Sequence, residues 1–148
     1  MNTHFAIAVH ALALLASEGG GPLTSSYIAA SVGTNPVFLR RCLRDLQRAG
    51  LVEIQRGSEG GVRLARPAGE TPLDEVYAAV TAGTPLFKTH LAPSSKCPVG
   101  RNAAVSLGAV FSDADAALRR HLRGKSVADV LAGILETDAA RTGASSES

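Results

Sequence analysis

Four arginines stand within nine residues of the chain, at positions 40, 41, 44 and 48, with Asp45 as the one acidic residue among them. A guanidinium group can form a paired hydrogen bond with guanine or bind a phosphate, so this segment is a candidate for contact with nucleic acid. The alternative for the same side chains is a solvated helix face. The candidate contact residues in this segment and just before it are Thr34, Asn35, Val37, Arg40, Arg41 and Arg44. For Asn35, capping of the helix is favoured over reading of an adenine.

A second candidate is the segment RGSEGG at positions 56–61. Its glycines, Gly57, Gly60 and Gly61, would let a backbone pass close to a sugar-phosphate wall, and Arg56 could enter a narrow minor groove. Glu59 does not suit such a contact, and an ordinary hairpin turn would use glycines as well. Binding and plain turn formation therefore both remain open for this segment.

Ser25, Ser26 and Tyr27 form a third candidate group, near the start of a short helix. Their side chains could donate to a phosphate, and the helix dipole would help. A serine at this place is equally expected as a simple N-cap.

The elements that carry these residues follow one another in a recognisable order. Apolar residues predict a helix over 4–17 that is buried on several sides, and the GGGP segment ends it. A helix of about two turns follows, then a turn at Gly33 and a third helix that runs to about Ala49. The segments LVEIQRG and VRLAR alternate polar and apolar residues around the turn SEGG, which predicts a β-hairpin. Helix, helix, turn, helix and hairpin is the order of a winged helix-turn-helix.

The second half of the chain predicts further helices. Thr71 is the expected cap of a fourth helix, with Asp74 three residues on, and residues 83–98 read as a loop. A long helix is expected from about Val99 to Leu122, and a last helix starts at Ser126. Residues at spacings of three and four give the long helix an apolar stripe, which implies a partner helix: Leu107, Val110, Phe111, Ala114, Leu118 and Leu122. The predicted fold class is mainly α with a small β-hairpin: a winged helix-turn-helix at 1–67, a linker and dimerisation region with a long C-terminal dimerisation helix at 68–138, and a disordered tail at 139–148.

Composition narrows the classes of function. The chain has 148 residues with a formal net charge of +2, and residues 1–67 hold seven arginines against four acidic residues. The longest apolar run, 11–16, is far too short to cross a membrane, and His10 with the absence of Lys or Arg before it argues against a signal peptide, so a cytoplasmic location is expected. The nucleotide-binding, zinc-protease and hydrolase motifs are all missing, so neither catalytic nor metal-binding residues are expected.

These motifs together resemble a known family. The N-terminal helix, the stretch TNPVFLRRCLRDLQRAGLVEIQRGSEGGVRLAR and the ending SVADVL are similar to the IscR/NsrR/CymR-type (Rrf-two) family of bacterial winged-helix transcription regulators, over about residues 1–136. The most specific piece runs from Leu46 to Arg66. The resemblance implies a homodimer that binds palindromic operator DNA and usually represses. By motif position, Asn35, Pro36, Arg40 and Arg41 match the recognition-helix stretch, and Arg56, Gly60 and Gly61 match the wing. Val62 departs from the aromatic residue common after the paired glycines.

The largest departure from the family pattern concerns the residues that would sense a signal. Cluster-binding members carry three cysteines before the dimerisation helix, because iron bound by sulfur needs several thiolates together. This chain has only Cys97 there, so no cluster and no other cofactor is expected. Cys97 is instead a candidate thiol sensor, since nearby cations favour the thiolate, with an inert remnant as the alternative. Cys42 is expected in the core. A small-molecule effector is a further candidate, with Phe87, Leu91 and Tyr77 as lining residues that are equally expected in the core.

The sequence thus predicts a homodimeric, DNA-binding transcription regulator whose partner is double-stranded DNA. The alternative is a winged-helix module for protein interaction without sequence-specific DNA binding. Such a surface should carry exposed apolar anchors where this one carries arginines.

Overall fold

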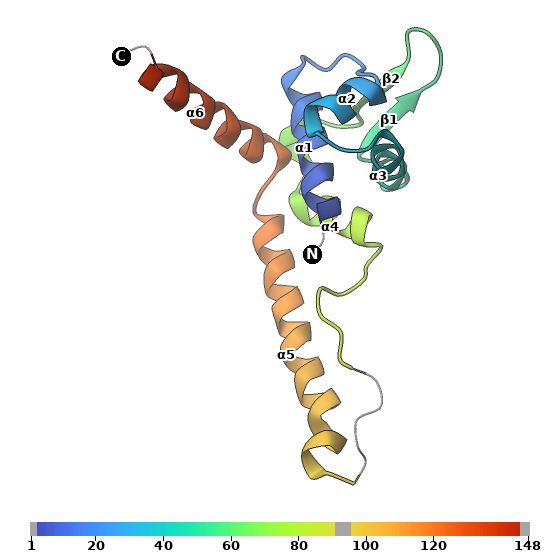
Figure 1. The fold of residues 1–148 in the computed structure, drawn as a ribbon, viewed down its shortest axis with the longest axis vertical. Coiled ribbons are helices and arrows are strands. Elements are labelled where there is room, and N and C mark those ends of the chain that lie inside the picture. The colour runs from blue at the N-terminus through green and yellow to red at the C-terminus, as the bar shows by residue number, and fades with distance from the viewer. Residues whose placement is uncertain (1–2, 91–95, 146–148) are drawn as a thin grey trace.

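The computed structural model of the protein describes residues 3–90 and 96–145, and it has the predicted mainly helical fold with one β-hairpin. The elements are α1 (Thr3–Ser17), α2 (Ser25–Val32), α3 (Pro36–Arg48), β1 (Val52–Gln55), β2 (Gly61–Leu64), a 3-10 turn η1 (Ala68–Glu70), α4 (Leu73–Thr81), α5 (Pro98–Arg123) and α6 (Val127–Ser145). Figure 1 shows a compact head, made by α1 to α4 and the hairpin, from which α5 and α6 extend in different directions.

Helix α1 is the centre of the head. It packs against α2, α3, α4 and α6, and Ala8, Ala11 and Leu12 have no exposed surface. Because neighbours pack on several sides of α1, apolar residues cover most of its circumference, and its small alanine side chains let these neighbours approach closely. On α3 the buried residues Leu39, Leu43 and Leu46 face this core, so the other faces of α3 are left for solvent or a partner.

Two side-chain caps fix where α2 and α3 begin. The Thr24 hydroxyl accepts a hydrogen bond from the Tyr27 N–H at 3.2 Å, and the Asn35 side-chain oxygen accepts from the Val37 N–H at 2.8 Å. Between the two helices, Gly33 takes a left-handed conformation with φ of 71°, which ends α2 and turns the chain into α3. The capping interpretation of Asn35 is confirmed.

The hairpin is anchored to the head by a third, short strand-like segment. Strands β1 and β2 are antiparallel, with Ile54 opposite Val62. On the other side of β2, the Leu23 N–H donates to the Val62 carbonyl at 2.9 Å and the Val62 N–H donates to the Leu23 carbonyl at 2.8 Å. The hairpin is therefore held in place by the segment that precedes α2.

The start of α4 differs from the prediction. Thr71 does not cap this helix: it is fully buried, and its hydroxyl donates to the Pro67 carbonyl at 3.0 Å. Helix α4 begins after Pro72, and the Leu73 N–H donates instead to the Lys125 carbonyl at 2.9 Å. The pattern that resembled a cap was wrong because this segment pairs with the junction between α5 and α6.

The apolar stripe predicted for the long helix divides between two faces of α5. Leu118 and Leu122 pack against the core of the head, and the Phe111 ring contacts Phe87 of the preceding loop. Val110, by contrast, is 61% exposed. The chain itself therefore covers part of the stripe, and a narrower face of α5 remains uncovered.

Helix α6 continues further than the sequence indicated. Its first turn is capped by Ser126, whose hydroxyl accepts from the Asp129 N–H at 3.2 Å. The helix then runs to Ser145, so the expectation of disorder from residue 139 is not met for 139–145. Alanine and arginine in this stretch favour helix strongly, and solvent exposure alone does not prevent it. The last three residues of that expected tail lie outside the described residues.

Candidate nucleic-acid interface

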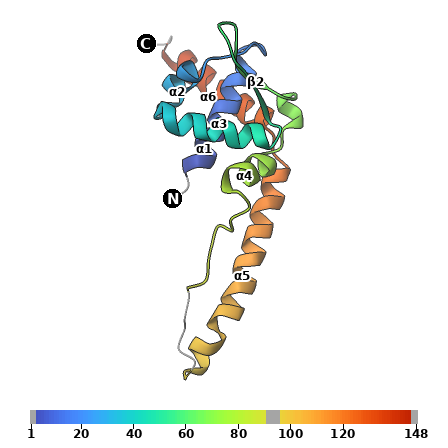
Figure 2. The ribbon, with the colours of Figure 1, turned by 90° about the vertical axis from the view of Figure 1, so that its right-hand side faces the viewer.

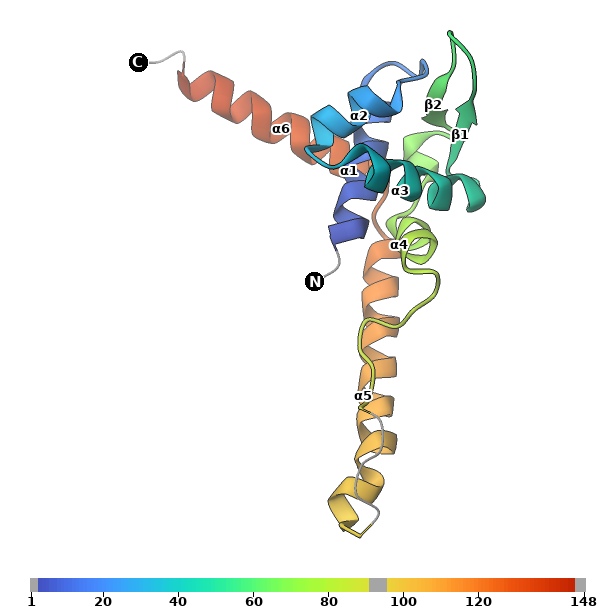
Figure 3. The same ribbon diagram turned by 45° about the vertical axis from the view of Figure 1, so that its right-hand side comes forward.

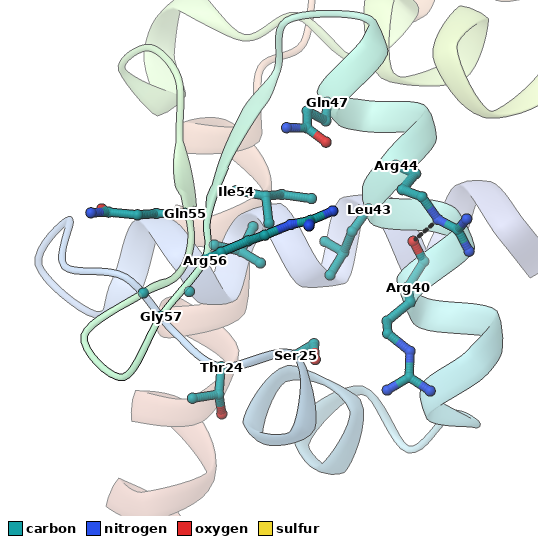
Figure 4. A pocket seen from close by; sticks show the side chains of 13 residues that line it. Thr24, Ser25, Arg40, Leu43, Arg44, Gln47, Ile54, Gln55, Arg56 and Gly57 are labelled. Atoms are coloured by element: carbon teal, nitrogen blue, oxygen red, sulfur yellow. Dashed lines mark hydrogen bonds between the residues drawn. The ribbon is translucent and has the colours of Figure 1, made fainter.

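A groove of about 510 Å³ lies between α3, the hairpin and the start of α2. Figure 4 shows this groove from close by, with side chains from all three elements around it. No aspartate or glutamate is among its lining residues, which are Thr24, Ser25, Arg40, Leu43, Arg44, Gln47, Ile54, Gln55, Arg56, Gly57, Gly60, Gly61 and Val62. The groove therefore has a floor of a few apolar side chains and walls that are polar or positively charged.

Three arginines give this groove its charge. Arg40 and Arg44 lie one turn apart on α3, and Arg56 extends from the hairpin across the groove toward α3, whereas Gln55 points away (Figure 4). Within residues 3–90 and 96–145, no carboxylate forms an ion pair with any of these three arginines. Uncompensated positive charge in a concave site attracts a polyanion.

Two neighbouring arginines are neutralised instead. Arg48 pairs with Asp45 one turn earlier on α3, and Arg63 pairs with Glu53 across the hairpin, with Nε 2.8 Å from the carboxylate. Asp45 and Glu53 are thus engaged by arginines outside the groove, and Glu59 at the hairpin tip does not line it.

Arg41 lies apart from the groove, although the sequence placed it with the other candidates. It lines a separate hollow with His4, Asp45 and Arg48, on the neighbouring face of α3. On a helix, residues 40, 44 and 47 share one face, and residues 41, 45 and 48 share another. Arg41 therefore does not line the groove that Arg40, Arg44 and Arg56 share, although it lines a neighbouring hollow with Arg44 and Gln47.

Gln47 is a groove residue that the sequence reasoning missed. It is exposed and lines the groove one turn after Arg44, and Figure 4 shows it on α3 beyond that arginine. The helical spacing of positions 40, 44 and 47 carried this signal. Glutamine can form a paired hydrogen bond with adenine, so this side chain suits contact with a base edge.

The first turn of α3 presents an exposed apolar side chain, that of Val37. The Asn35 amide oxygen is already engaged as the cap, and the Thr34 N–H donates to the Ala29 carbonyl at 3.1 Å. Pro36 occupies the first helical position, and Val37 beside it is 65% exposed. An exposed apolar side chain at the start of α3 suits contact with a thymine methyl group.

The three residues predicted at the start of α2 have different surroundings. Ser25 lines the groove, and Ser26 is exposed. The Tyr27 hydroxyl donates to a carboxylate oxygen of Glu18 at 3.2 Å, and this hydrogen bond, with the negative charge of Glu18, raises the pKa of Tyr27. Tyr27 therefore already has a local acceptor for its proton.

Gly60 and Gly61 are required by the protein's own backbone. A Cβ atom at Gly60 would lie 2.1 Å from the Gln55 carbonyl oxygen, and one at Gly61 would lie 2.7 Å from the Leu23 carbonyl oxygen. Gly61 also has a φ of 151°, which side chains disfavour. These glycines thus shape the hairpin tip and place Arg56, a role that needs no contact with DNA.

The two cysteines differ in burial and in the direction in which the pKa of the thiol is shifted. Burial, with a smaller effect from the charge of Asp45, raises the pKa of Cys42 to about 12, as expected for a core thiol. Cys97 is exposed just before α5, where the backbone N–H groups of Gly100 and Val99 lower the pKa of its thiol. The sequence predicted a lowered pKa for Cys97 from nearby cations, and the lowering arises instead from backbone N–H groups at the start of α5.

Comparison with known proteins finds a family model and a relative of the same functional class. The sequence model of a family described as an iron-dependent transcriptional regulator matches residues 1–133. YwnA of Bacillus subtilis (strain 168), whose name assigns it to the HTH-type transcriptional regulators, is 35% identical over 131 residues, which cover 88% of this chain and 96% of that protein.

Two crystal structures share the fold. A protein from Lactobacillus plantarum, named as a transcriptional regulator, superposes with a TM-score of 0.79 over 100% of both chains at 22% identity. IscR of T. potens superposes with a TM-score of 0.69, covering 93% of this chain and 89% of its own, at 22% identity.

The iron in that family description does not fit the residues of this chain. The whole sequence holds two cysteines, and they lie in different elements, one in the core on α3 and one before α5. In the described parts of the chain, no group of three histidine, cysteine or acidic residues could hold a metal ion. The same residues contain no helix long and apolar enough to cross a membrane.

Proposed function

The chain belongs to the Rrf2 family of transcriptional regulators, and we propose that it acts as a homodimeric repressor that binds a palindromic operator in double-stranded DNA. Members of this family bind DNA and are not enzymes.

The observation that carries the proposal is the acid-free groove with Arg40, Arg44 and Arg56. In a winged helix-turn-helix, the second helix of the motif enters the major groove and the wing follows the phosphate backbone beside it. Here α3 and the hairpin form the two walls of one groove, so both can engage the same stretch of duplex. A protein-interaction surface would instead need apolar anchors where these arginines stand.

The uncovered face of α5 supports a dimer. One face of this helix, on the side away from the loop, carries apolar residues at spacings of three, four and seven, which are one or two helical turns: Val99, Ala103, Val110, Ala114 and Ala117. Val99 and Val110 are 77% and 61% exposed, and the alanines allow two helices to approach closely. A second copy of α5 would cover this stripe, and a two-fold pair of heads matches a palindromic site.

The experiment starts by selecting bound fragments from genomic DNA of the source organism with the purified chain. Fluorescence anisotropy then measures the affinity for a selected fragment at several salt concentrations. We expect log affinity to fall with log salt with a slope of about 0.9 per phosphate contact. A flat salt response, or fragments without a palindrome, would contradict the proposal.

Repression has its own readout. Transcription in vitro from a promoter that carries the selected fragment should fall as the protein is added, because the bound dimer blocks the polymerase. An increase in transcript would instead indicate an activator.

A further inference from the structure

A cavity of about 370 Å³, distant from the arginine groove, lies between α5 and the segment that follows α4. Residues 84–90 run alongside α5 in the views of Figures 1 and 2. Phe87 and Lys88 line this space from the segment, and Phe111, Ser112 and Asp115 line it from α5. Its volume lies within the range of small-molecule sites, and Cys97 is not among its lining residues.

Two phenylalanine rings form the apolar wall. The centroids of Phe87 and Phe111 lie 5.3 Å apart, and Phe87 is still 48% exposed. Half of a large apolar surface therefore faces solvent beside the cavity. An apolar group placed in the cavity would remove that surface from water.

The carboxylate of Asp115 gives the cavity a hydrogen-bond acceptor. Oδ2 of Asp115 accepts from Arg119 Nε at 2.8 Å, but Oδ1 is buried and accepts no hydrogen bond in the described residues. The Asp115 side chain as a whole is 19% exposed and lines the cavity, so its carboxylate favours a ligand that brings a hydrogen-bond donor.

The charged side chains that line the cavity restrict the chemical class of its ligand. Lys88 and Asp115 are the two charged side chains that line the cavity, and no ion pair of Lys88 occurs in the part of the chain that the structure describes. A ligand with a carboxylate for Lys88, an ammonium group for Asp115 and an apolar body for the rings would complement all three features. We infer that this cavity binds a free amino acid with an apolar side chain, as the effector of the regulator.

The site has a contiguous route to the DNA-binding head. Arg119, which pairs with Asp115, lies over the Tyr77 ring of α4 with its guanidinium carbon 5.5 Å from the ring centre. The Tyr77 ring meets Phe5 of α1 edge-on at 5.5 Å, and α4 also packs against α3. A ligand that orders Asp115 and Arg119 thus acts on the packing of the helix that supports α3.

The test is isothermal titration calorimetry of the full chain with L-leucine, L-isoleucine, L-valine, L-methionine and L-phenylalanine. We expect saturable binding of at least one of them, with one site per chain. Its N-acetyl derivative and its amide, which each lose one of the two charges, should bind at least about ten-fold more weakly. No saturable binding of any of the five up to about 10 mM would overturn the proposal.

A pair of variants locates the site. A Cβ at Gly108 meets nothing within 4 Å, and Gly108 lines the cavity, so Gly108→Leu fills it while favouring the helix. Ala109→Leu adds bulk to the next, exposed position. We expect the first variant to lose binding and the second to keep it, and binding that survives Gly108→Leu would overturn the assignment. The titration contains no DNA, so its failure would leave the DNA-binding proposal untouched.

Discussion

Arg56 and Arg63 stand in the same hairpin but have opposite surroundings. Arg63 is held by Glu53, whereas Arg56 has no carboxylate partner among the described residues and extends over the groove. We expect Arg56→Ala to weaken operator binding by roughly 1–3 kcal/mol, because it removes a contact to the duplex. Fluorescence anisotropy on one selected operator measures the change.

Arg63→Ala is the matched control, since it removes the same side chain from the same hairpin. Its exposed ion pair is worth about 0–1 kcal/mol, so operator affinity should change little. Equal losses in the two variants would show that charge anywhere on the hairpin is sufficient and would remove Arg56 from the site.

The two thiols should react at different pH. Only a thiolate reacts with iodoacetamide, and the pKa of Cys97 is lowered from its ordinary value of 9.0 while that of Cys42 is raised to about 12. In the folded protein we therefore expect alkylation of Cys97 with a midpoint below pH 9 and no alkylation of Cys42 until the chain unfolds. Mass spectrometry of the labelled peptides checks this, and labelling of native Cys42 at neutral pH would contradict its burial.

The residues that the sequence predicted well are those whose role depends on near neighbours. Asn35 was favoured as a cap from two or three residues of context, and this cap is present. The role of Gly61 could not be found in that way, because it depends on the backbone of Leu23, which is distant in sequence and approaches only in the fold. Thr71 was mistaken for a cap for the same reason.

The hairpin is a rigid wall because its second strand is paired on both sides. Gly61 makes this possible, since its φ of 151° and the nearby Leu23 carbonyl leave no room for a side chain. We expect Gly61→Ala to cost about 1–3 kcal/mol of folding stability and also to weaken operator binding by moving Arg56. Thermal unfolding followed by circular dichroism measures the first effect, and anisotropy the second.

Gly69→Ala provides the comparison. Gly69 is exposed in η1, and a Cβ there would meet nothing within 4 Å, so the change should stay within about 0.5 kcal/mol. A Gly61→Ala variant as stable as Gly69→Ala would show that the hairpin adapts and is not held by Leu23.

The division of the apolar residues of α5 between two faces could not be predicted from their spacing. The spacing of its apolar residues predicted one stripe, yet Leu118 and Leu122 pack on the head while Val110 stays exposed. Periodicity indicates that an apolar residue is buried, but it does not indicate whether the same chain or a partner chain buries it. The split between the faces depends on the position of residues 84–90, which have no periodic pattern of their own.

The proposed assembly of two chains rests on that exposed face. Val110 and Val105 are both exposed valines on α5, but only Val110 belongs to the stripe with Ala103 and Ala114. We expect Val110→Asp to give a monomer that binds the operator far more weakly, because a buried unpaired charge opposes association. Sedimentation velocity measures the change in mass. Val105→Asp adds the same charge on another side of α5 and should remain a dimer, and a dimeric Val110→Asp protein would contradict the proposed interface.

The hairpin and the N-terminal end of α5 lie at opposite ends of the molecule in Figure 3, joined by a helix of 26 residues without a break. In a dimer held through α5, the length of this helix sets the distance and the rotation between the two DNA-binding heads. Each residue inserted between the stripe and the head would turn that head by about 100° and displace it by about 1.5 Å. The half-site spacing that such a dimer can read is therefore encoded in the length of α5, which can change without loss of register only by nearly complete turns.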